Sequence, residues 1–160
     1  MPTATTTETY QQMRARFQRE FDEFPFLFAF SDEQFDSALA ERGWKESQLV
    51  CVMPGGFVQR NDLKRLHSMI NSHDCELRAA MTDYDFAYRA FLDEMSNHEY
   101  HLDTWQADWD VCSCFGDAEY IVDKDGPAYL AEMGYADVTQ RAYRDARRRF
   151  YQLCDENGWW

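Results

Sequence analysis

Apolar side chains at helical spacing are the feature that most constrains the fold of this chain. In the C-terminal segment they recur every three or four positions, and this stripe consists of Val138, Ala142, Ala146, Phe150 and Leu153. A stripe with this period forms one face of an amphipathic helix, and other elements must cover that face. Asp137 is expected to cap the helix and Gly158 to end it. The chain is therefore expected to bury helices against one aromatic-rich core.

The same spacing elsewhere predicts a mostly α fold of about five helices, with α+β as the alternative. The segments that carry it are 8–24, 32–42, 61–81, 83–98, the short 126–133, and 137–158. Ser31 and Gln34 have the spacing of a capping box at the start of the second segment. Six phenylalanines on these stripes are expected to share the core: Phe17, Phe21, Phe35, Phe86, Phe91 and Phe150.

Three segments depart from the helical pattern. Residues 47–58 contain two extended pieces around a Pro-Gly-Gly turn, which predicts a small hairpin. Residues 101–126 have no clear period and are expected to form an irregular acidic segment, while residues 1–7 are expected to be frayed. Because no linker or change of composition divides the 160 residues, a single acidic helical domain, 1–160, is predicted.

Composition limits where the protein works and what it binds. Apolar residues make up 45% of the chain, which is too much for a disordered acidic tail despite the net charge of −13. The chain has no run of 18 apolar residues and no signal peptide, so a cytoplasmic location is expected, with the five cysteines as thiols. This negative balance disfavours direct binding to nucleic acid or to anionic membranes.

The negative charge is concentrated in the middle of the chain. Residues 71–137 hold 16 acidic and 3 basic side chains, whereas the flanking segments are nearly neutral. One interpretation is a solvated surface that keeps the protein soluble. The other is a face that docks onto a basic partner and occupies a groove built for phosphates. The candidate partner-binding residues of such a face are Asp103, Trp105, Asp108, Trp109, Asp110, Asp117, Glu119, Tyr120, Asp123 and Asp125.

Charge reversal separates these two interpretations. An exposed ion pair contributes about 0–1 kcal/mol to stability, so reversal should weaken binding to a partner and leave the fold intact. The acids chosen for reversal to lysine are Asp103, Asp108, Asp110, Asp117 and Glu119.

The last predicted helix carries the basic counterpart of the acidic segment. Pairing with the central acids, within the fold or across a dimer, is favoured over a phosphate site. These arginines are Arg141, Arg144, Arg147, Arg148 and Arg149.

Two histidines and two cysteines raise the question of a metal. His98, His101, Cys112 and Cys114 could supply the four ligands of a zinc site. However, Cys pairs in structural zinc sites are usually separated by two to four residues, and His98-Glu-Tyr-His101 lacks the zincin spacing. We expect that neither histidine binds metal and that at least one is packed at a helix end with its ring hydrogen-bonded. No cofactor and no catalytic residue is predicted, and a metal-dependent enzyme centred on these four residues is an alternative.

Three stretches, FAFSDEQF, PGGFVQRNDL and FAYRAFLDEMSNHEY, resemble a family of small uncharacterised proteins carried by bacteriophages and mobile elements of gut bacteria. The third ends in the family's Asn-His-Glu-aromatic string, here residues 97–100. The resemblance brings no known activity, so no catalytic residue is carried over. It implies a context, because small phage accessory proteins often inhibit host defence, and an acidic member is an anti-restriction or anti-CRISPR candidate.

The sequence therefore predicts a non-enzymatic binding protein, an inhibitor of a nucleic-acid-handling defence complex in the host cytosol. Its acidic face would act as a DNA mimic that blocks a nucleic-acid-binding groove. The expected partner is a basic nucleic-acid-binding protein or a CRISPR effector subunit. The alternatives are a metal-dependent enzyme and a homo-oligomeric structural or regulatory protein, which includes a homodimer.

Overall fold

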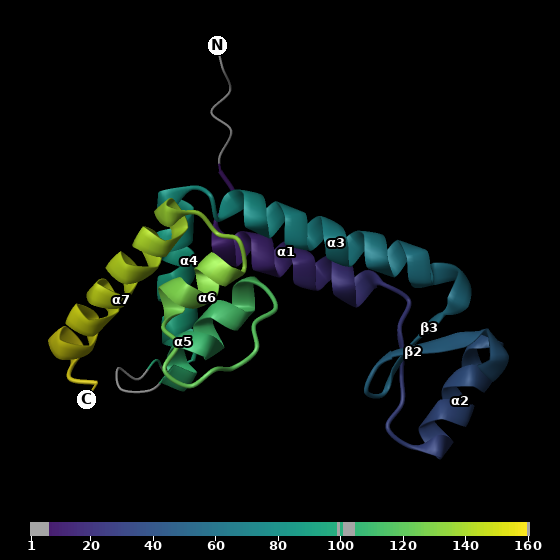
Figure 1. Cartoon of the computed structure of the whole chain (residues 1–160). Coiled ribbons are helices and arrows are strands. Elements are labelled where there is room, and N and C mark those ends of the chain that lie inside the picture. The colour runs from purple at the N-terminus through teal and green to yellow at the C-terminus, as the bar shows by residue number, and fades with distance from the viewer. Residues whose placement is uncertain (1–6, 99, 101–104, 160) are drawn as a thin grey trace, which may run out of the picture. The chain divides into compact units, whose positions relative to one another are not determined.

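A computed structural model describes residues 7–98, 100 and 105–159 of the chain (Figure 1). This part of the chain is mostly helical with a small antiparallel sheet, which confirms the predicted fold class. The helices are α1 (Tyr10–Glu23), α2 (Asp32–Arg42), α3 (Leu63–Ala80), α4 (Tyr84–Asn97), α5 (Trp105–Cys112), α6 (Gly126–Glu132) and α7 (Asp137–Asn157). The strands are β1 (Leu27–Phe28), β2 (Leu49–Met53) and β3 (Gly56–Gln59). Within these described residues, no helix has both the length and the apolar character that a membrane crossing requires.

The contacts of the chain divide it into two compact units. The sheet unit is Ala15–His73, and the helical unit combines Met1–Arg14 with Asp74–Trp160. Helices α1 and α3 each contribute residues to both units. The organisation as one domain stays a prediction.

The sheet unit contains the predicted hairpin and one strand that the sequence did not indicate. Strands β2 and β3 pair antiparallel, and β1 pairs with the other edge of β3, so the strand order is β1-β3-β2. The two-residue β1 lies in the apolar stretch before α2. The hydroxyl of Ser31 caps α2 by accepting the Gln34 N–H at 3.3 Å, and Gln34 Oε1 accepts from Phe30 N–H at 2.9 Å. The capping box therefore forms with its return bond shifted by one residue.

Aromatic side chains fill the small core of the sheet unit. Phe21 packs against a buried cluster around Phe26, and Phe35 packs against a cluster around Leu27. Phe17 stacks on the ring of His73 with ring centroids 4.0 Å apart. Phe17, Phe21 and Phe35 are each half-buried.

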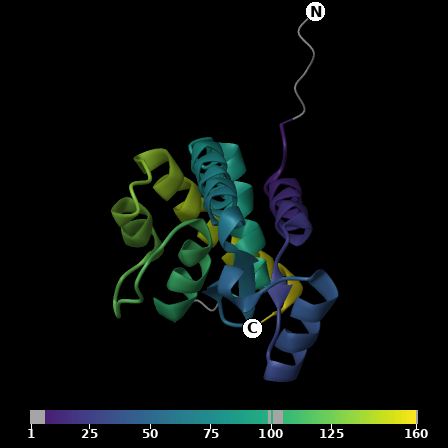
Figure 2. The same cartoon turned by 90° about the vertical axis from the view of Figure 1, so that its right-hand side faces the viewer.

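The helical unit has the more completely buried core. Helices α4, α5, α6 and α7 gather together in both views (Figures 1 and 2). At their centre the fully buried ring of Phe91 meets Phe115 and Tyr143 edge to face, at centroid distances of 4.9 and 5.0 Å. Phe86 and Phe150 are buried in the same unit. The six phenylalanines predicted to form the core thus divide between the two units.

Helix α7 begins one residue earlier than the sequence predicts. Ala136 occupies the N-cap position, and Asp137 is the first helical residue, where its charge still complements the helix dipole. Gly158 ends the helix with φ of 64°, as expected for a residue in the left-handed region.

Helix α5 corrects the expectation that residues 101–126 are irregular. It begins at Trp105, and its buried face includes the polar Asp108, which interrupts the apolar period. Residues 117–125 contain no helix or strand, as predicted, and residues 101–104 lie outside the described part of the chain.

Candidate functional site

The predicted partner-binding residues have three different environments. The exposed side chains are Trp105, Asp117, Glu119, Tyr120, Asp123 and Asp125. Of these, Asp125 caps α6 by accepting the Ala128 N–H at 3.0 Å. Trp109 and Asp110 are half-buried, and Asp108 is buried. Asp103 lies outside the described residues. The exposed acids thus lie in residues 117–125, which we call the acidic loop.

Asp108 is not part of any exposed face, because only 2% of its surface is accessible. Its Oδ1 accepts hydrogen bonds from the hydroxyls of Tyr100 and Tyr143, and its Oδ2 accepts from the Gly126 N–H at 3.0 Å. Arg147 Nη1 lies 3.8 Å from Oδ2 and supplies the opposite charge. This buried carboxylate links α5, α6 and α7, so reversing it to lysine should disrupt the fold. The expectation that reversal leaves the fold intact does not apply to this residue.

Gly126 makes this network possible. A Cβ atom at Gly126 would lie 2.2 Å from Cε1 of Tyr143, which is far inside van der Waals contact. The absence of a side chain therefore lets the Tyr143 ring reach Asp108, while the Gly126 N–H binds the same carboxylate.

Alkaline pH is expected to lower the stability of the helical unit, because it deprotonates the buried phenols of Tyr100 and Tyr143. Burial, with the negative charge of Asp108 nearby, raises the pKa of Tyr100 and of Tyr143 above the usual value of about 10. A raised folded-state pKa contributes stability that is complete below pH ~10 and is lost as the pH rises above that value. We expect the free energy of unfolding to fall above pH ~10, and to fall less steeply in Tyr143→Phe.

Denaturant titrations at several alkaline pH values measure this slope. Tyr120→Phe changes an exposed tyrosine and is the matched control. Equal slopes in wild type and Tyr143→Phe would show that the buried phenol does not govern alkaline unfolding.

Hydrogen bonds from Trp109 and Tyr129 anchor the backbone of the acidic loop at Ala118 and Ile121. The indole N–H of Trp109 donates to the Ala118 carbonyl at 2.7 Å. The Tyr129 hydroxyl accepts from the Ile121 N–H at 3.0 Å and donates to the Ile121 carbonyl at 3.1 Å. A loop ordered before binding loses little conformational entropy when a partner docks.

Three consecutive apolar side chains form an exposed tip on this loop. Tyr120, Ile121 and Val122 are 40%, 47% and 64% exposed. The edge of the Tyr120 ring packs against Trp109, at a centroid distance of 6.0 Å. Ile121 and Val122 are not among the residues predicted from the sequence, although an apolar run inside an acidic stretch is a signal that could indicate them. Exposed apolar runs are uncommon on soluble proteins unless they serve a contact.

Most of the negative charge around this tip is not neutralised by a lysine of the loop. Lys124 is the basic residue of the loop, and its Nζ pairs with Glu132 over the Tyr129 ring. Asp117 and Glu119 also line a pocket beside the loop, which the paired Lys124 and Glu132 line as well. A lysine of the chain itself therefore already lies in this pocket, and the carboxylates that remain for a partner are those on its rim.

The arginines of α7 are largely engaged within the helical unit. Arg148 pairs with Asp145, Arg149 pairs with Glu156, and Arg141 lies over the Tyr84 ring. Arg147 lies beside the central acid Asp108, as expected, whereas the partners of Arg148 and Arg149 are acids of α7 itself and not central acids.

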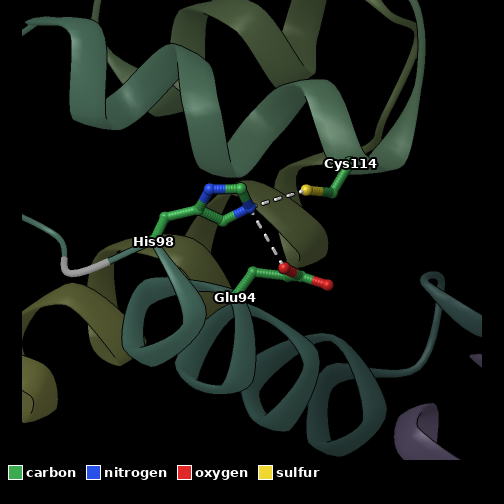
Figure 3. Close-up of side chains that lie close together, drawn as sticks. All are labelled: Glu94, His98 and Cys114. Carbon is green, nitrogen blue, oxygen red and sulfur yellow. Dashed lines mark hydrogen bonds and ion pairs between the residues drawn. The ribbon is translucent and has the colours of Figure 1, made fainter.

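A second cluster joins Glu94, His98 and Cys114 (Figure 3). Glu94 lies in the last turn of α4, His98 is the residue directly after this helix, and Cys114 lies two residues after the end of α5. His98 Nε2 is 3.4 Å from Cys114 Sγ and 3.3 Å from Glu94 Oε2. The expectation of a histidine with a hydrogen-bonded ring at a helix end is confirmed for His98.

This cluster differs from the four-residue metal site drawn from the sequence. Cys112 is buried, and its thiol donates to the Gly126 carbonyl at 3.5 Å. His101 lies outside the described residues. Glu94 contributes the third ligand atom instead. It is not among the residues predicted from the sequence, although its four-residue spacing from His98 is that of neighbours on one helix face.

The geometry of the cluster does not fit an activated nucleophile. In a catalytic triad the acid binds the second ring nitrogen of histidine, but here Nε2 faces both the thiol and the carboxylate. Burial, with Glu94 nearby, raises the pKa of Cys114 to about 12, so the free thiol keeps its proton. Of the described residues, these three could hold a metal ion.

A model for a family of unknown function (DUF7659) matches residues 9–108. The matched region includes Glu94, His98 and Asp108 and ends before Cys114 and the acidic loop. No curated protein and no solved structure matches the chain. The resemblance to proteins of phages and mobile elements stays a prediction.

Proposed function

Because the chain belongs to the DUF7659 family, whose function is unknown, we propose a function for the chain from its acidic loop. In this proposal the chain is a non-enzymatic protein that binds a basic partner. The observation that carries this proposal is the exposed run of Tyr120, Ile121 and Val122 between acidic residues on a loop that hydrogen bonds anchor at Ala118 and Ile121.

The two kinds of side chain have separate roles in this proposal. The apolar tip supplies contact area that loses its water on binding, which gives most of the affinity in protein interfaces. Asp117, Glu119 and Asp123 attract a basic surface and repel acidic ones, which raises the association rate and selects the partner.

We propose further that the partner is a nucleic-acid-handling defence complex of a host bacterium, such as a CRISPR effector or a restriction enzyme. The support is the charge distribution, since a basic groove built for phosphates accepts carboxylates at similar positions. The resemblance to phage-borne proteins supports the same partner class. A second copy of the chain is the alternative partner, which light scattering on the purified protein tests.

Removing the apolar tip should weaken partner binding without changing the salt dependence. We expect the double variant Ile121→Ser with Val122→Ser to bind a purified effector at least about tenfold more weakly than wild type, which corresponds to about 1.4 kcal/mol. Because no charge is changed, the slope of affinity against salt between about 0.05 and about 0.5 M should stay the same.

The assay is a pull-down or surface-binding measurement against purified CRISPR effectors and restriction enzymes. Phe28→Ser with Ile70→Ser removes two exposed apolar side chains elsewhere and is the matched control. If the tip variant and this control bind as wild type does, the acidic loop is not the docking surface.

A further inference from the structure

Glu94, His98 and Cys114 bring three different metal-binding atoms to one point. A carboxylate oxygen, an imidazole nitrogen and a thiol sulfur all lie within 4.8 Å of one another. Glu94 comes from the last turn of α4, His98 follows directly after that helix, and Cys114 comes from the turn after α5; Figure 3 shows all three side chains pointing toward the same space. This assembly lies outside the acidic loop and does not depend on the proposed function.

The spacing of these atoms is that of a tetrahedral zinc site. Zinc binds sulfur at about 2.3 Å and nitrogen or oxygen at about 2.0–2.2 Å, so tetrahedral angles place sulfur and nitrogen about 3.5 Å apart and nitrogen and oxygen about 3.4 Å apart. The observed distances from His98 Nε2 are 3.4 Å to Cys114 Sγ and 3.3 Å to Glu94 Oε2. These two distances match the zinc geometry, and the third pair, the sulfur of Cys114 and a carboxylate oxygen of Glu94, lies within 4.8 Å.

A hydrogen bond from outside the cluster orients the carboxylate. The hydroxyl of Tyr10 donates to Oε1 of Glu94, which leaves Oε2 facing His98. Tyr10 itself is buried and packs against the rings of Phe86 and Phe115. Metal ligands are commonly fixed by outer hydrogen bonds of this kind.

From this convergence we propose that Glu94, His98 and Cys114 bind one Zn²⁺ ion, which replaces the expectation from the sequence that His98 binds no metal. On binding, the S–H bond of Cys114 breaks, its proton passes to solvent, and the thiolate forms the Zn–S bond; no electron transfer is involved. The fourth position holds a water molecule, and the partly exposed ring of His98 gives the ion access from solvent. A thiolate with an imidazole selects zinc over magnesium or calcium, which prefer oxygen ligands.

Cobalt(II) is the probe, because it replaces zinc in tetrahedral sites and reports a thiolate ligand by its near-ultraviolet charge-transfer band. We expect the metal-free full-length protein to bind one equivalent of cobalt with this band, and zinc to displace it. The variants Cys114→Ser and His98→Ala should each lower zinc affinity by at least about tenfold, and Cys114→Ser should abolish the band.

Matched controls are Cys51→Ser, Cys75→Ser and His67→Ala, which change exposed side chains and should bind as wild type does. Thermal unfolding checks that each variant folds, and zinc should raise the unfolding temperature of wild type and these controls alone. His98→Ala, which alters a partly exposed residue, keeps the test valid if Cys114→Ser misfolds.

Three results would overturn the zinc site. They are the absence of stoichiometric cobalt or zinc binding, cobalt binding without the thiolate band, and unchanged affinity in Cys114→Ser and His98→Ala. In each case Glu94 is only a buried carboxylate whose charge is satisfied by Tyr10, His98 and Cys114.

Discussion

Replacing Asp108 with alanine is expected to lower the free energy of unfolding by about 3–5 kcal/mol. The carboxylate accepts from Tyr100, Tyr143 and the Gly126 N–H, and the side chain is 2% exposed. Alanine would leave these buried donors without their acceptor and Arg147 without the nearby opposite charge. Each orphaned buried donor costs about 1–3 kcal/mol, so the total reaches the range expected for a broken buried ion pair.

Chemical denaturation of the two proteins measures this difference. Asp117→Ala removes an exposed carboxylate from the acidic loop and is the control, with an expected change within about 0.5 kcal/mol. A value for Asp108→Ala within about 1 kcal/mol of wild type would show that the network does not hold α5, α6 and α7 together.

Replacing Phe91 with alanine is expected to cost a similar amount, about 3–5 kcal/mol. The ring is fully buried and meets Phe115 and Tyr143 edge to face. Its removal leaves a cavity in the middle of the helical unit. Because Tyr143 is also hydrogen-bonded to Asp108, its ring cannot move freely to fill that cavity.

The control for Phe91→Ala is the same substitution at Phe30, which is 78% exposed. Phe30→Ala should change the free energy of unfolding by less than about 0.5 kcal/mol in the same denaturation experiment. If both variants unfold at the same denaturant concentration, Phe91 does not occupy the centre of the core.

The helices could be predicted where local sequence signals agree with the packing. Helix α7 carries an unbroken apolar stripe and a closing glycine, and Ser31 and Gly43 bound α2. Strand β1 was not predictable, because two residues carry no period and are defined by pairing with β3. Helix α5 was missed because Asp108 lies on its buried face, where a periodic pattern requires an apolar residue.

The candidate sites were predicted only in part, for a related reason. The count of acidic residues located the charged segment. The local sequence does not distinguish Asp108 from Asp117, however, and only the tertiary partners of Asp108, Tyr100 and Tyr143, show that Asp108 is buried. Glu94 was missed because it is one of 29 acidic residues, and its contact with Cys114 depends on how α4 packs beside α5.

Competition with DNA tests the central claim, docking of the acidic loop onto a basic partner, most directly. The displacement of labelled DNA from a purified effector is measured for wild type and for the triple variant Asp117→Lys, Glu119→Lys, Asp123→Lys. The control reverses three exposed acids of α2, Glu33, Asp36 and Glu41, and changes the net charge equally. We predict that wild type and the control displace the DNA, most strongly at low salt, and that the loop variant folds but loses this ability. Equal displacement by all three proteins, or binding that does not respond to salt, would contradict the account.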